Sequence, residues 1–142
     1  MLRRRGVSVR ARALLGVRFA RMSNGKDYLG GCHCGKVRYE VKADLGAPVI
    51  ACNCSMCAKK GTLLTFVPSA DFKLLSGEEA LTRYQFNKKV IDHLFCSTCG
   101  VTSFARGKRS DGTAMVAINT RCLEGVDVQT LEVKHFDGAS AG

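Results

Sequence analysis

Seven of the eight cysteines fall into three short clusters whose spacing is typical of metal ligands. The clusters are Cys32-His-Cys34, Cys52-Asn-Cys54-Ser-Met-Cys57 and Cys96-Ser-Thr-Cys99, and the remaining cysteine is Cys122. Structural disulfides are disfavoured because the first residues lack the continuous apolar stretch of a secretory signal. C-x-C and C-x-x-C pairs are also poor places for such bridges. We therefore expect these thiols to bind zinc.

Local geometry is expected to bring the thiols of each short pair together. In a strand, Cys32 and Cys34 would project to one face and the residue between them to the other. The two residues between Cys96 and Cys99 predict a turn of the zinc-knuckle kind. Gly100 follows this turn and suits the left-handed conformation that such turns often need.

The number of thiols indicates two sites of different kinds. A closed structural zinc site takes four protein ligands, whereas a catalytic zinc site takes three and keeps one position open. The first and third clusters together supply four thiols from opposite ends of the domain, and the middle cluster supplies three. In an alternative partition Cys122 completes the middle cluster, although we expect this residue to be a buried small hydrophobe instead. Asp, His or water can also fill the fourth place.

The middle cluster would benefit from nearby positive charge. Three thiolates on Zn²⁺ carry a net charge of −1, and a fourth thiolate makes it −2. Lys59 and Lys60 follow Cys57 directly and can balance this charge. The alternative is that the two lysines form only a solvated turn before Gly61.

The length and composition of the chain limit the kinds of protein that can carry these sites. The chain has 142 residues, enough for one domain, and 46% of them are hydrophobic. No apolar run approaches the roughly 18–20 residues that a membrane-spanning helix needs, so we exclude an integral membrane protein.

The net charge of +10 is concentrated at the N-terminus: residues 1–26 carry eight Lys or Arg and no acid, which leaves 14 basic against 12 acidic residues in 27–142. Nucleic-acid binding would depend on the tail alone, and we expect neither nucleic acid nor membrane as a partner.

Residues 1–26 are interpreted as a basic N-terminal tail that precedes the working domain at 27–142. Arginines among small and apolar residues, with no acids, are typical of a mitochondrial transit peptide. The alternative is a start codon assigned too early, with Met22 as the real beginning. We expect a cytoplasmic protein, or a mitochondrial one if the tail is a genuine transit peptide.

Alternating apolar and polar residues predict an all-β domain. Val37, Tyr39 and Val41 alternate with charged residues, as in a strand with one face in water. Further strands are predicted over 47–51, 62–67, 72–75, 81–86, 90–95, 101–106, 114–119 and 131–136. Residues 75–80 allow no more than a helical turn. Because such a domain has a thin core, the binding free energy of a structural zinc, about 10–16 kcal/mol, is expected to hold the ends of the sheet together.

Several stretches match a known family. Residues 29–41, 52–57 and 93–104, with shorter blocks at 121–124 and 135–138, resemble the glutathione-dependent formaldehyde-activating enzyme and centromere protein V family. Within that family, residues 72–77 and 101–104 look nearer the centromere protein V branch. The resemblance covers nearly all of 29–138.

The resemblance implies a β-tent fold of antiparallel sheets with two zinc ions per chain. The family's structural zinc ligands correspond to Cys32, Cys34, Cys96 and Cys99. The ligands of the zinc associated with activity correspond to Cys52, Cys54 and Cys57. The family's reaction, of the carbon–sulfur lyase type, joins glutathione and formaldehyde to give S-(hydroxymethyl)glutathione. A related small thiol or small aldehyde is the wider substrate class.

Such a reaction also needs groups beyond the metal. Zinc favours the thiolate of glutathione, and formaldehyde held beside it meets a nucleophile already in position. His93, Tyr84 or a water molecule are candidates to protonate the alkoxide, although both side chains also suit ordinary places in a sheet. Lys59, Lys60 and Arg121 are candidates to bind the carboxylates of glutathione.

The alternative function is a zinc-stabilised interaction module without catalysis. In that case both metals are structural, and a fourth protein ligand on the middle cluster would favour this interpretation. An open fourth position would favour the enzyme. Fold and metal ligands do not by themselves fix the substrate. The oligomeric state is not predicted.

Overall fold

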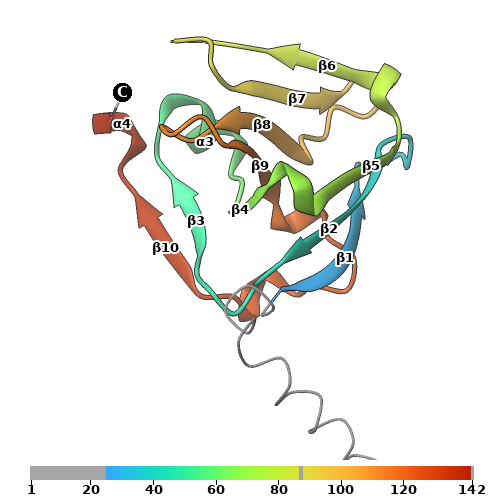
Figure 1. Cartoon of the computed structure of the whole chain (residues 1–142), viewed down its shortest axis with the longest axis horizontal. Coiled ribbons are helices and arrows are strands. Elements are labelled where there is room, and N and C mark those ends of the chain that lie inside the picture. Colours follow the sequence, from blue (N-terminus) through green and yellow to red (C-terminus); the bar gives the residue numbers. More distant parts are fainter. Residues whose placement is uncertain (1–24, 87, 142) are drawn as a thin grey trace, which may run out of the picture.

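The computed structural model describes residues 25–86 and 88–141, which form two β-sheets and several short helical segments (Figure 1). The smaller sheet has the order β1 (Lys26–Gly31), β2 (Arg38–Ala43) and β5 (Phe72–Ser76). The larger sheet has the order β10 (Val133–Phe136), β3 (Val49–Cys52), β4 (Leu64–Pro68), β9 (Ala114–Asn119), β8 (Phe104–Lys108), β7 (Asp92–Cys96) and β6 (Leu81–Tyr84). The prediction of an all-β domain is confirmed.

The helical segments are short and lie between strands. They are α3 (Ser55–Lys60), α4 (Gly138–Ala141) and the 3₁₀ segments η2 (Ser69–Asp71), η3 (Glu78–Ala80), η4 (Thr120–Cys122) and η5 (Val128–Thr130). The helical turn allowed at 75–80 is therefore present as η3. Within residues 25–86 and 88–141, the helices are too short and too polar to cross a membrane.

One strand pair departs from the expected antiparallel arrangement. β10 runs parallel to β3, with Val133 opposite Val49 and Phe136 opposite Cys52, whereas the other described pairs are antiparallel. A parallel pair needs a long connection, and the chain between β3 and β10 builds most of the larger sheet. The C-terminal strand consequently returns to the middle cysteine cluster.

The core lies between the two sheets. Tyr39 on β2, Phe72 on β5 and Phe104 on β8 pack against one another, with ring centroids 4.7, 5.1 and 5.6 Å apart. The Tyr39 hydroxyl donates a hydrogen bond to the Ser103 carbonyl at 3.3 Å. Val41, on the same face of β2, is buried as well. The apolar face predicted from the alternation around Tyr39 is thus the face that joins the small sheet to the large one.

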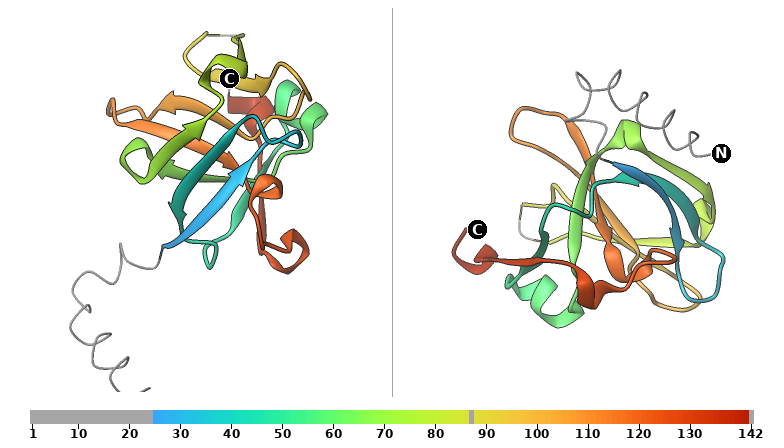
Figure 2. Two further views of the ribbon diagram at one scale, coloured as in Figure 1. Left: turned by 90° about the vertical axis from the view of Figure 1, so that its right-hand side faces the viewer. Right: turned by 90° about the horizontal axis from the view of Figure 1, so that it is seen from below.

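The larger sheet bends strongly between its two edges. In Figure 1, β3 and β10 stand upright on one side, while β6 and β7 run across the top. Both views in Figure 2 show the C-terminal end beside α3. The cavity described below is lined by residues on the face of this sheet that is turned away from the core.

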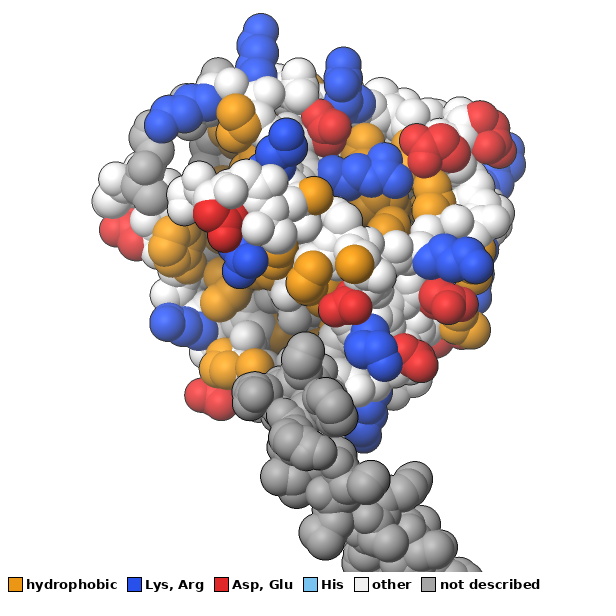
Figure 3. Space-filling model, viewed as in Figure 1, with side chains coloured by type: hydrophobic (Ala, Val, Ile, Leu, Met, Phe, Trp, Pro, Cys, Tyr) orange, Lys and Arg blue, Asp and Glu red, His pale blue; other side chains and the backbone are white. Residues whose placement is uncertain are grey.

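The basic tail is outside the described residues up to residue 24, so its interpretation as a transit peptide or a misplaced start stays a prediction. Lys26, counted with the tail, already belongs to β1 and lies opposite Ala43. Basic and acidic side chains are interspersed on the face shown in Figure 3. This agrees with the near-balance of charge in residues 27–142.

Candidate metal centres

The first and third cysteine clusters meet at one point between the sheets. The sulfur atoms of this four-thiol group lie within 4.8 Å of one another, and its members are Cys32, Cys34, Cys96 and Cys99. The Cys34 Sγ is 3.6 Å from the Cys32 Sγ and 3.7 Å from the Cys96 Sγ. Four sulfurs placed about 2.3 Å from a tetrahedral zinc would be about 3.8 Å apart. The four-thiol group therefore fits a closed zinc site.

The first pair of this group is positioned by a turn. β1 ends at Gly31, and Cys32 and Cys34 lie in the connection to β2, so the expectation that they alternate along a strand is wrong. The N–H of Cys32 donates to the Val37 carbonyl at 3.0 Å, and the N–H of Val37 donates to the Cys32 sulfur at 3.3 Å. Gly35 provides the positive φ of 87° that this tight turn requires. The turn, rather than the pleat of a strand, brings the two sulfurs together.

The second pair follows β7, as the sequence predicts. Gly100 has a φ of 80°, and its N–H donates to the Cys96 carbonyl at 2.8 Å. The N–H of Thr98 donates to the Cys96 sulfur at 3.4 Å. The N–H of Val101, the largest influence, lowers the pKa of Cys99 to about 6. Because the two pairs come from different sheets, a metal in this group would cross-link the small sheet to the large one.

The middle cluster forms a second group, which we call the thiol triplet: Cys52, Cys54 and Cys57, with sulfurs within 4.8 Å of one another. Cys52 ends β3, Cys54 is the N-cap of α3, and Cys57 lies in its first turn. The N–H of Cys54 donates to the Cys52 sulfur and the N–H of Cys57 to the Cys54 sulfur, each at 3.4 Å. Gly61, with a φ of 69°, ends α3. The start of α3 therefore places the Cys54 and Cys57 thiols close to the Cys52 thiol at the end of β3.

Electrostatics favour a cation at the triplet. Burial, followed by the Cys54 thiol, raises the pKa of Cys57 to about 12. Burial also acts to raise the pKa of Cys54, but hydrogen bonds from the Cys57 N–H and from the Cys57 and Cys52 thiols outweigh it and lower that pKa. In the absence of a metal, Cys54 therefore loses its proton readily, whereas a second thiolate at Cys57 is unfavourable. Zinc has a strong affinity for thiolates and relieves this repulsion, so the donor set fits it.

Cys122 lies beside the four-thiol group and not in the triplet. Its sulfur is 3.8 Å from the Thr102 carbonyl oxygen. Burial raises its pKa to about 11, with smaller contributions from Cys32 and Cys99. Among the described residues, no fourth Cys, His, Asp or Glu joins the triplet. The alternative partition, in which Cys122 completes the middle cluster, is therefore wrong for this structure.

A cavity of about 660 Å³ opens directly from the triplet. The polar side chains on its wall are Lys60, Thr62, Lys88, His93, Thr102 and Asn119. The rest of the wall is apolar and includes four phenylalanines, Phe66, Phe86, Phe104 and Phe136. Three thiols with an open side thus face a chamber that can hold an organic substrate.

Of the two candidate proton donors, His93 lines this cavity and Tyr84 is absent from its lining. The Tyr84 ring stacks on Phe86 with centroids 6.1 Å apart, and Phe86 in turn lies 5.2 Å from the His93 ring. Burial lowers the pKa of His93, and the ammonium of Lys60 lowers it further. Both effects, opposed in part by Asp92, favour the neutral imidazole.

The three candidate carboxylate-binding cations occupy different places. Lys60 is on the cavity wall, and burial lowers its pKa against the opposing charge of the triplet. Lys59 is exposed, and neither it nor Arg121 is among the lining residues. The Arg121 Nε donates to the Gly61 carbonyl at 3.3 Å, so this side chain lies at the end of α3. The structure brings one of the three cations to the triplet.

The C-terminal segment packs on the triplet, a feature that the sequence analysis missed. The Asn53 side chain donates to the Asp137 carboxylate at 3.1 Å and accepts from the N–H of Ala139 at 2.8 Å. A Cβ added at Gly138 would collide with the Cys52 sulfur. The block at 135–138 in the family resemblance was the one available signal.

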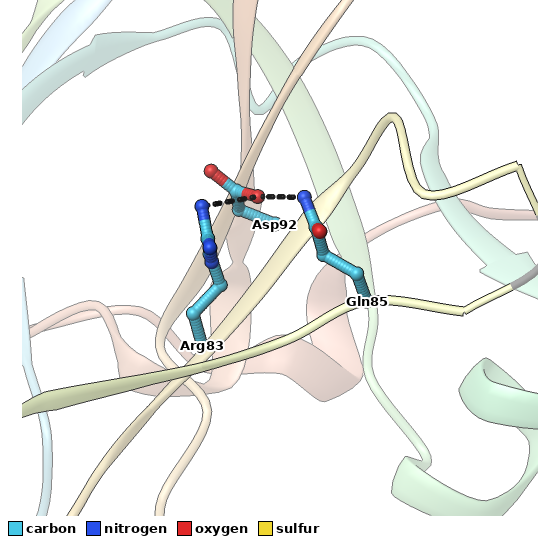
Figure 4. Close-up of polar contacts among 3 residues, drawn as sticks. All are labelled: Arg83, Gln85 and Asp92. Carbon is cyan, nitrogen blue, oxygen red and sulfur yellow. Dashed lines mark hydrogen bonds and ion pairs between the residues drawn. The ribbon is translucent and has the colours of Figure 1, made fainter.

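The connection between β6 and β7 forms another part of the wall. It contributes four cavity-lining residues, among them Phe86 and Ile91. The Asp92 carboxylate accepts a hydrogen bond from the Gln85 amide at 2.6 Å and pairs with Arg83 at 3.9 Å, as Figure 4 shows. Asp92 therefore ties the two ends of this connection together.

Comparison with known proteins identifies the family of the chain and a solved structure with a similar fold. Residues 27–135 match the family described as glutathione-dependent formaldehyde-activating enzyme. Among solved structures, the chain is similar to a Rhodobacter sphaeroides protein, a structural-genomics target, with 34% sequence identity and a TM-score of 0.68. That match covers 76% of this chain and 99% of the other. The chain belongs to the glutathione-dependent formaldehyde-activating enzyme family.

Proposed function

We propose that the protein condenses glutathione with formaldehyde to S-(hydroxymethyl)glutathione at the thiol triplet. One observation carries this proposal: the triplet offers three sulfurs, has no fourth protein ligand among the described residues, and opens into the 660 Å³ cavity. This is the arrangement of a catalytic zinc site rather than a structural one. Membership of the family supports the choice of substrates.

The two groups would hold two zinc ions with different tasks. In the four-thiol group the ion would be structural, because it would have four protein ligands and join the two sheets. A zinc on the triplet would stabilise the thiolate form of a thiol that takes its fourth position at neutral pH. The chain's own contribution is to orient the three cysteines through β3 and α3.

The reaction itself is an addition. The sulfur of glutathione bonds to the carbonyl carbon, the C=O π electrons move to oxygen, and the proton lost by the thiol ends on that oxygen. We assign the proton transfer to His93, because it is the candidate donor that lines the same cavity as the triplet. A neutral imidazole carries one N–H donor and one acceptor, so it can pass a proton without a net change of charge.

Cations near the triplet would orient glutathione, which carries two carboxylates. Lys60 is the proposed partner within the cavity. Lys59 precedes it in α3 and is exposed, and Arg121 lies at the end of the helix. Both are proposed partners at the rim.

The alternative of a zinc-stabilised interaction module has less support. A fourth protein ligand on the second metal would favour it, but Cys122, the thiol considered for this role, lies beside the four-thiol group. A closed second site is therefore not what the described residues form.

A titration of the zinc-loaded protein with glutathione tests the proposal. Isothermal calorimetry is expected to show saturable binding in the millimolar range or tighter. Cys54→Ala is expected to abolish this binding while circular dichroism shows the fold retained. Cys122→Ala is the matched control, since it removes a thiol outside both groups, and is expected to bind like the natural chain. No detectable binding by the natural chain at millimolar glutathione would contradict the proposal.

Catalysis needs a second readout, because formaldehyde adds to thiols without an enzyme. Exchange NMR with ¹³C-formaldehyde measures how fast free and thiol-bound formaldehyde interconvert. The natural chain is expected to accelerate this exchange above the uncatalysed rate, and Cys54→Ala is expected to leave it at that rate. Equal rates with and without the natural chain would leave a glutathione-binding protein without the proposed activity.

A further inference from the structure

We propose that the cavity beyond the triplet is a subsite for an apolar substituent, so that the protein accepts thiol adducts of alkyl aldehydes several carbons longer than formaldehyde. This inference rests on the proposed function, because it assumes a thiol adduct with its sulfur at the triplet. It concerns the part of the adduct that points away from the metal ligands.

The cavity is far larger than formaldehyde, and most of its wall is apolar, unlike glutathione. Formaldehyde has two heavy atoms and is comparable in size to a water molecule, whose share of liquid volume is about 30 Å³. The cavity measures about 660 Å³, within the range of sites for much larger organic ligands. Glutathione carries two carboxylates, an ammonium and two amides, yet most of the wall offers hydrocarbon. Polar groups placed against the apolar part of the wall, away from Lys60 and the other polar side chains, would lose their water without a partner.

The floor of the cavity is a row of residues that crosses four strands. Phe66 on β4 lies opposite Ala117 on β9, Ala117 opposite Ala105 on β8, and Ala105 opposite His93 on β7. All four line the cavity. The two alanines in the middle make a trough between the Phe66 and His93 side chains. The proposed proton carrier therefore stands at one end of an apolar channel.

The trough continues away from the triplet. A second hollow of about 260 Å³ shares four lining residues with the first: Phe66, Ile91, Ala105 and Ala117. Its other lining residues are Gly107, Met115 and three cations, Arg106, Lys108 and Arg109. Gly107 and Met115 are opposite each other, two residues further along β8 and β9. Two residues of a strand span about 6.6 Å, which suits a short alkyl chain lying along the sheet.

Apolar side chains around the trough are left in contact with water. Phe66 is 52% exposed, Ile91 44% and Phe136 50%, and all three line the cavity. Exposed apolar side chains that line one cavity are typical of a binding site. An alkyl chain carried on the sulfur would cover it, whereas the charged parts of glutathione would not.

Two stable analogues test this inference without turnover. S-methylglutathione and S-hexylglutathione differ by five methylene groups, and each buried methylene is worth about 0.8 kcal/mol. Calorimetry with the zinc-loaded full chain is expected to show S-hexylglutathione binding at least about tenfold tighter. Equal affinities for the two analogues, or binding of neither, would overturn the inference.

Filling the trough gives the sharper test. Ala117→Leu places a larger side chain on the floor and is expected to remove most of the hexyl preference while S-methylglutathione binds as before. Ala114→Leu is the matched control, since Ala114 is exposed on the same strand and outside both hollows. If both variants weaken hexyl binding equally, the preference is not located in the trough and the inference is wrong.

A second variant guards against poor folding of the first. A Cβ added at Gly107 would stand 3.4 Å from the Ile91 Cγ1, an ordinary contact, so Gly107→Leu is expected to fold and to block the far end of the trough. Sedimentation is measured in parallel. If no hexyl preference is found and the chain forms dimers that Phe66→Glu separates, the trough is an interface between two copies and the inference is wrong.

The outcome is separable from that of the proposed function. Acceleration of the glutathione–formaldehyde exchange without a hexyl preference would support the proposed function and overturn the apolar subsite. A hexyl preference lost in Ala117→Leu, in a chain that does not accelerate that exchange, would support the subsite and contradict the proposed reaction.

Discussion

Gly138 and Cys52 lie so close together that a Cβ on the glycine would occupy the space of the cysteine sulfur. The two residues are far apart in the chain and meet because β10 pairs with β3. The C-terminal segment therefore forms one wall of the thiol triplet. Hydrogen bonds between Asn53 and both Asp137 and Ala139 hold it there.

Gly138→Ala is expected to weaken zinc binding at the triplet. The added methyl must displace the Cys52 sulfur or the C-terminal segment, and disturbing such supporting contacts typically costs about tenfold to a hundredfold in metal affinity. Competition with a coloured chelator measures the zinc affinities. It is expected to show one weakly bound zinc and one of unchanged affinity per chain. Gly46→Ala, in the turn between β2 and β3, is the control, since its nearest neighbour is the Asp44 carboxylate at 3.1 Å. Equal zinc affinity in Gly138→Ala and the natural chain would contradict the placement of the segment.

Loss of one ligand is expected to have unequal effects in the two thiol groups. Cys96 is fully buried and belongs to the group that joins the sheets, so Cys96→Ser removes much of the roughly 10–16 kcal/mol that a structural zinc supplies. We expect this variant not to unfold cooperatively. Cys57→Ser is expected to fold and melt cooperatively with about one zinc per chain. Thermal melts and metal analysis measure the cooperativity of unfolding and the zinc content of both variants. If Cys57→Ser loses cooperative unfolding and Cys96→Ser keeps it, the triplet holds the structural zinc and the account is wrong.

His93 is expected to contribute to acid sensitivity. Burial and Lys60 lower its pKa in the folded chain, so between about pH 6.5 and the lower folded value the unfolded chain binds more protons. The free energy of unfolding therefore falls as pH falls through this window and is unaffected above it. His93→Gln stays neutral and lacks this contribution. Urea unfolding of the zinc-loaded chains at pH 7.5 and 5.5 is expected to show a smaller loss of unfolding free energy for the variant. Equal losses would contradict a lowered pKa for the half-buried His93.

Asp92→Ala is expected to loosen the wall formed by the β6–β7 connection. It removes the acceptor for the Gln85 amide and the partner of Arg83, at a cost of about 1 kcal/mol in unfolding free energy. Hydrogen exchange of the amides at 88–91 is expected to accelerate. Asp92→Asn keeps an acceptor oxygen for Gln85. Its exchange rates are expected to lie between those of the natural chain and those of Asp92→Ala. Unchanged exchange in Asp92→Ala would show that other contacts hold the connection.

Short-range chemistry explains what the sequence predicted well. The grouping of the thiols followed from pairs only two or three residues apart and from the count of ligands that zinc takes. Gly100 was expected to be left-handed because its neighbours already defined the turn, and its φ is 80°. The strand through Tyr39 was evident because its alternation reflects one buried face.

Local backbone conformation was harder to predict where several interactions compete to decide it. The pair at Cys32 and Cys34 lies in a turn because Gly35 takes a positive φ and the N–H of Val37 bonds to sulfur. Neither feature is visible in a two-residue spacing. α3 has only six residues, fewer than two helical turns, so it leaves no periodic pattern.

The cavity depends on long-range register, which a sequence does not display. The row from Phe66 through Ala117 and Ala105 to His93 exists because four strands pair with one particular alignment. A shift of one residue in any of them would turn its side chain toward the core. The contact of Gly138 with the triplet likewise needs the parallel β3–β10 pair.

Zinc-edge X-ray absorption of the zinc-loaded chain tests the open triplet most directly. Four sulfurs at one ion and three at the other average about 3.5 sulfur ligands per zinc. Saturating glutathione is predicted to raise this average to about 4, while S-methylglutathione, which has no thiol to offer, leaves it near 3.5. An average of 4 before any thiol is added, or one that glutathione does not change, would contradict a vacant coordination position at Cys52, Cys54 and Cys57.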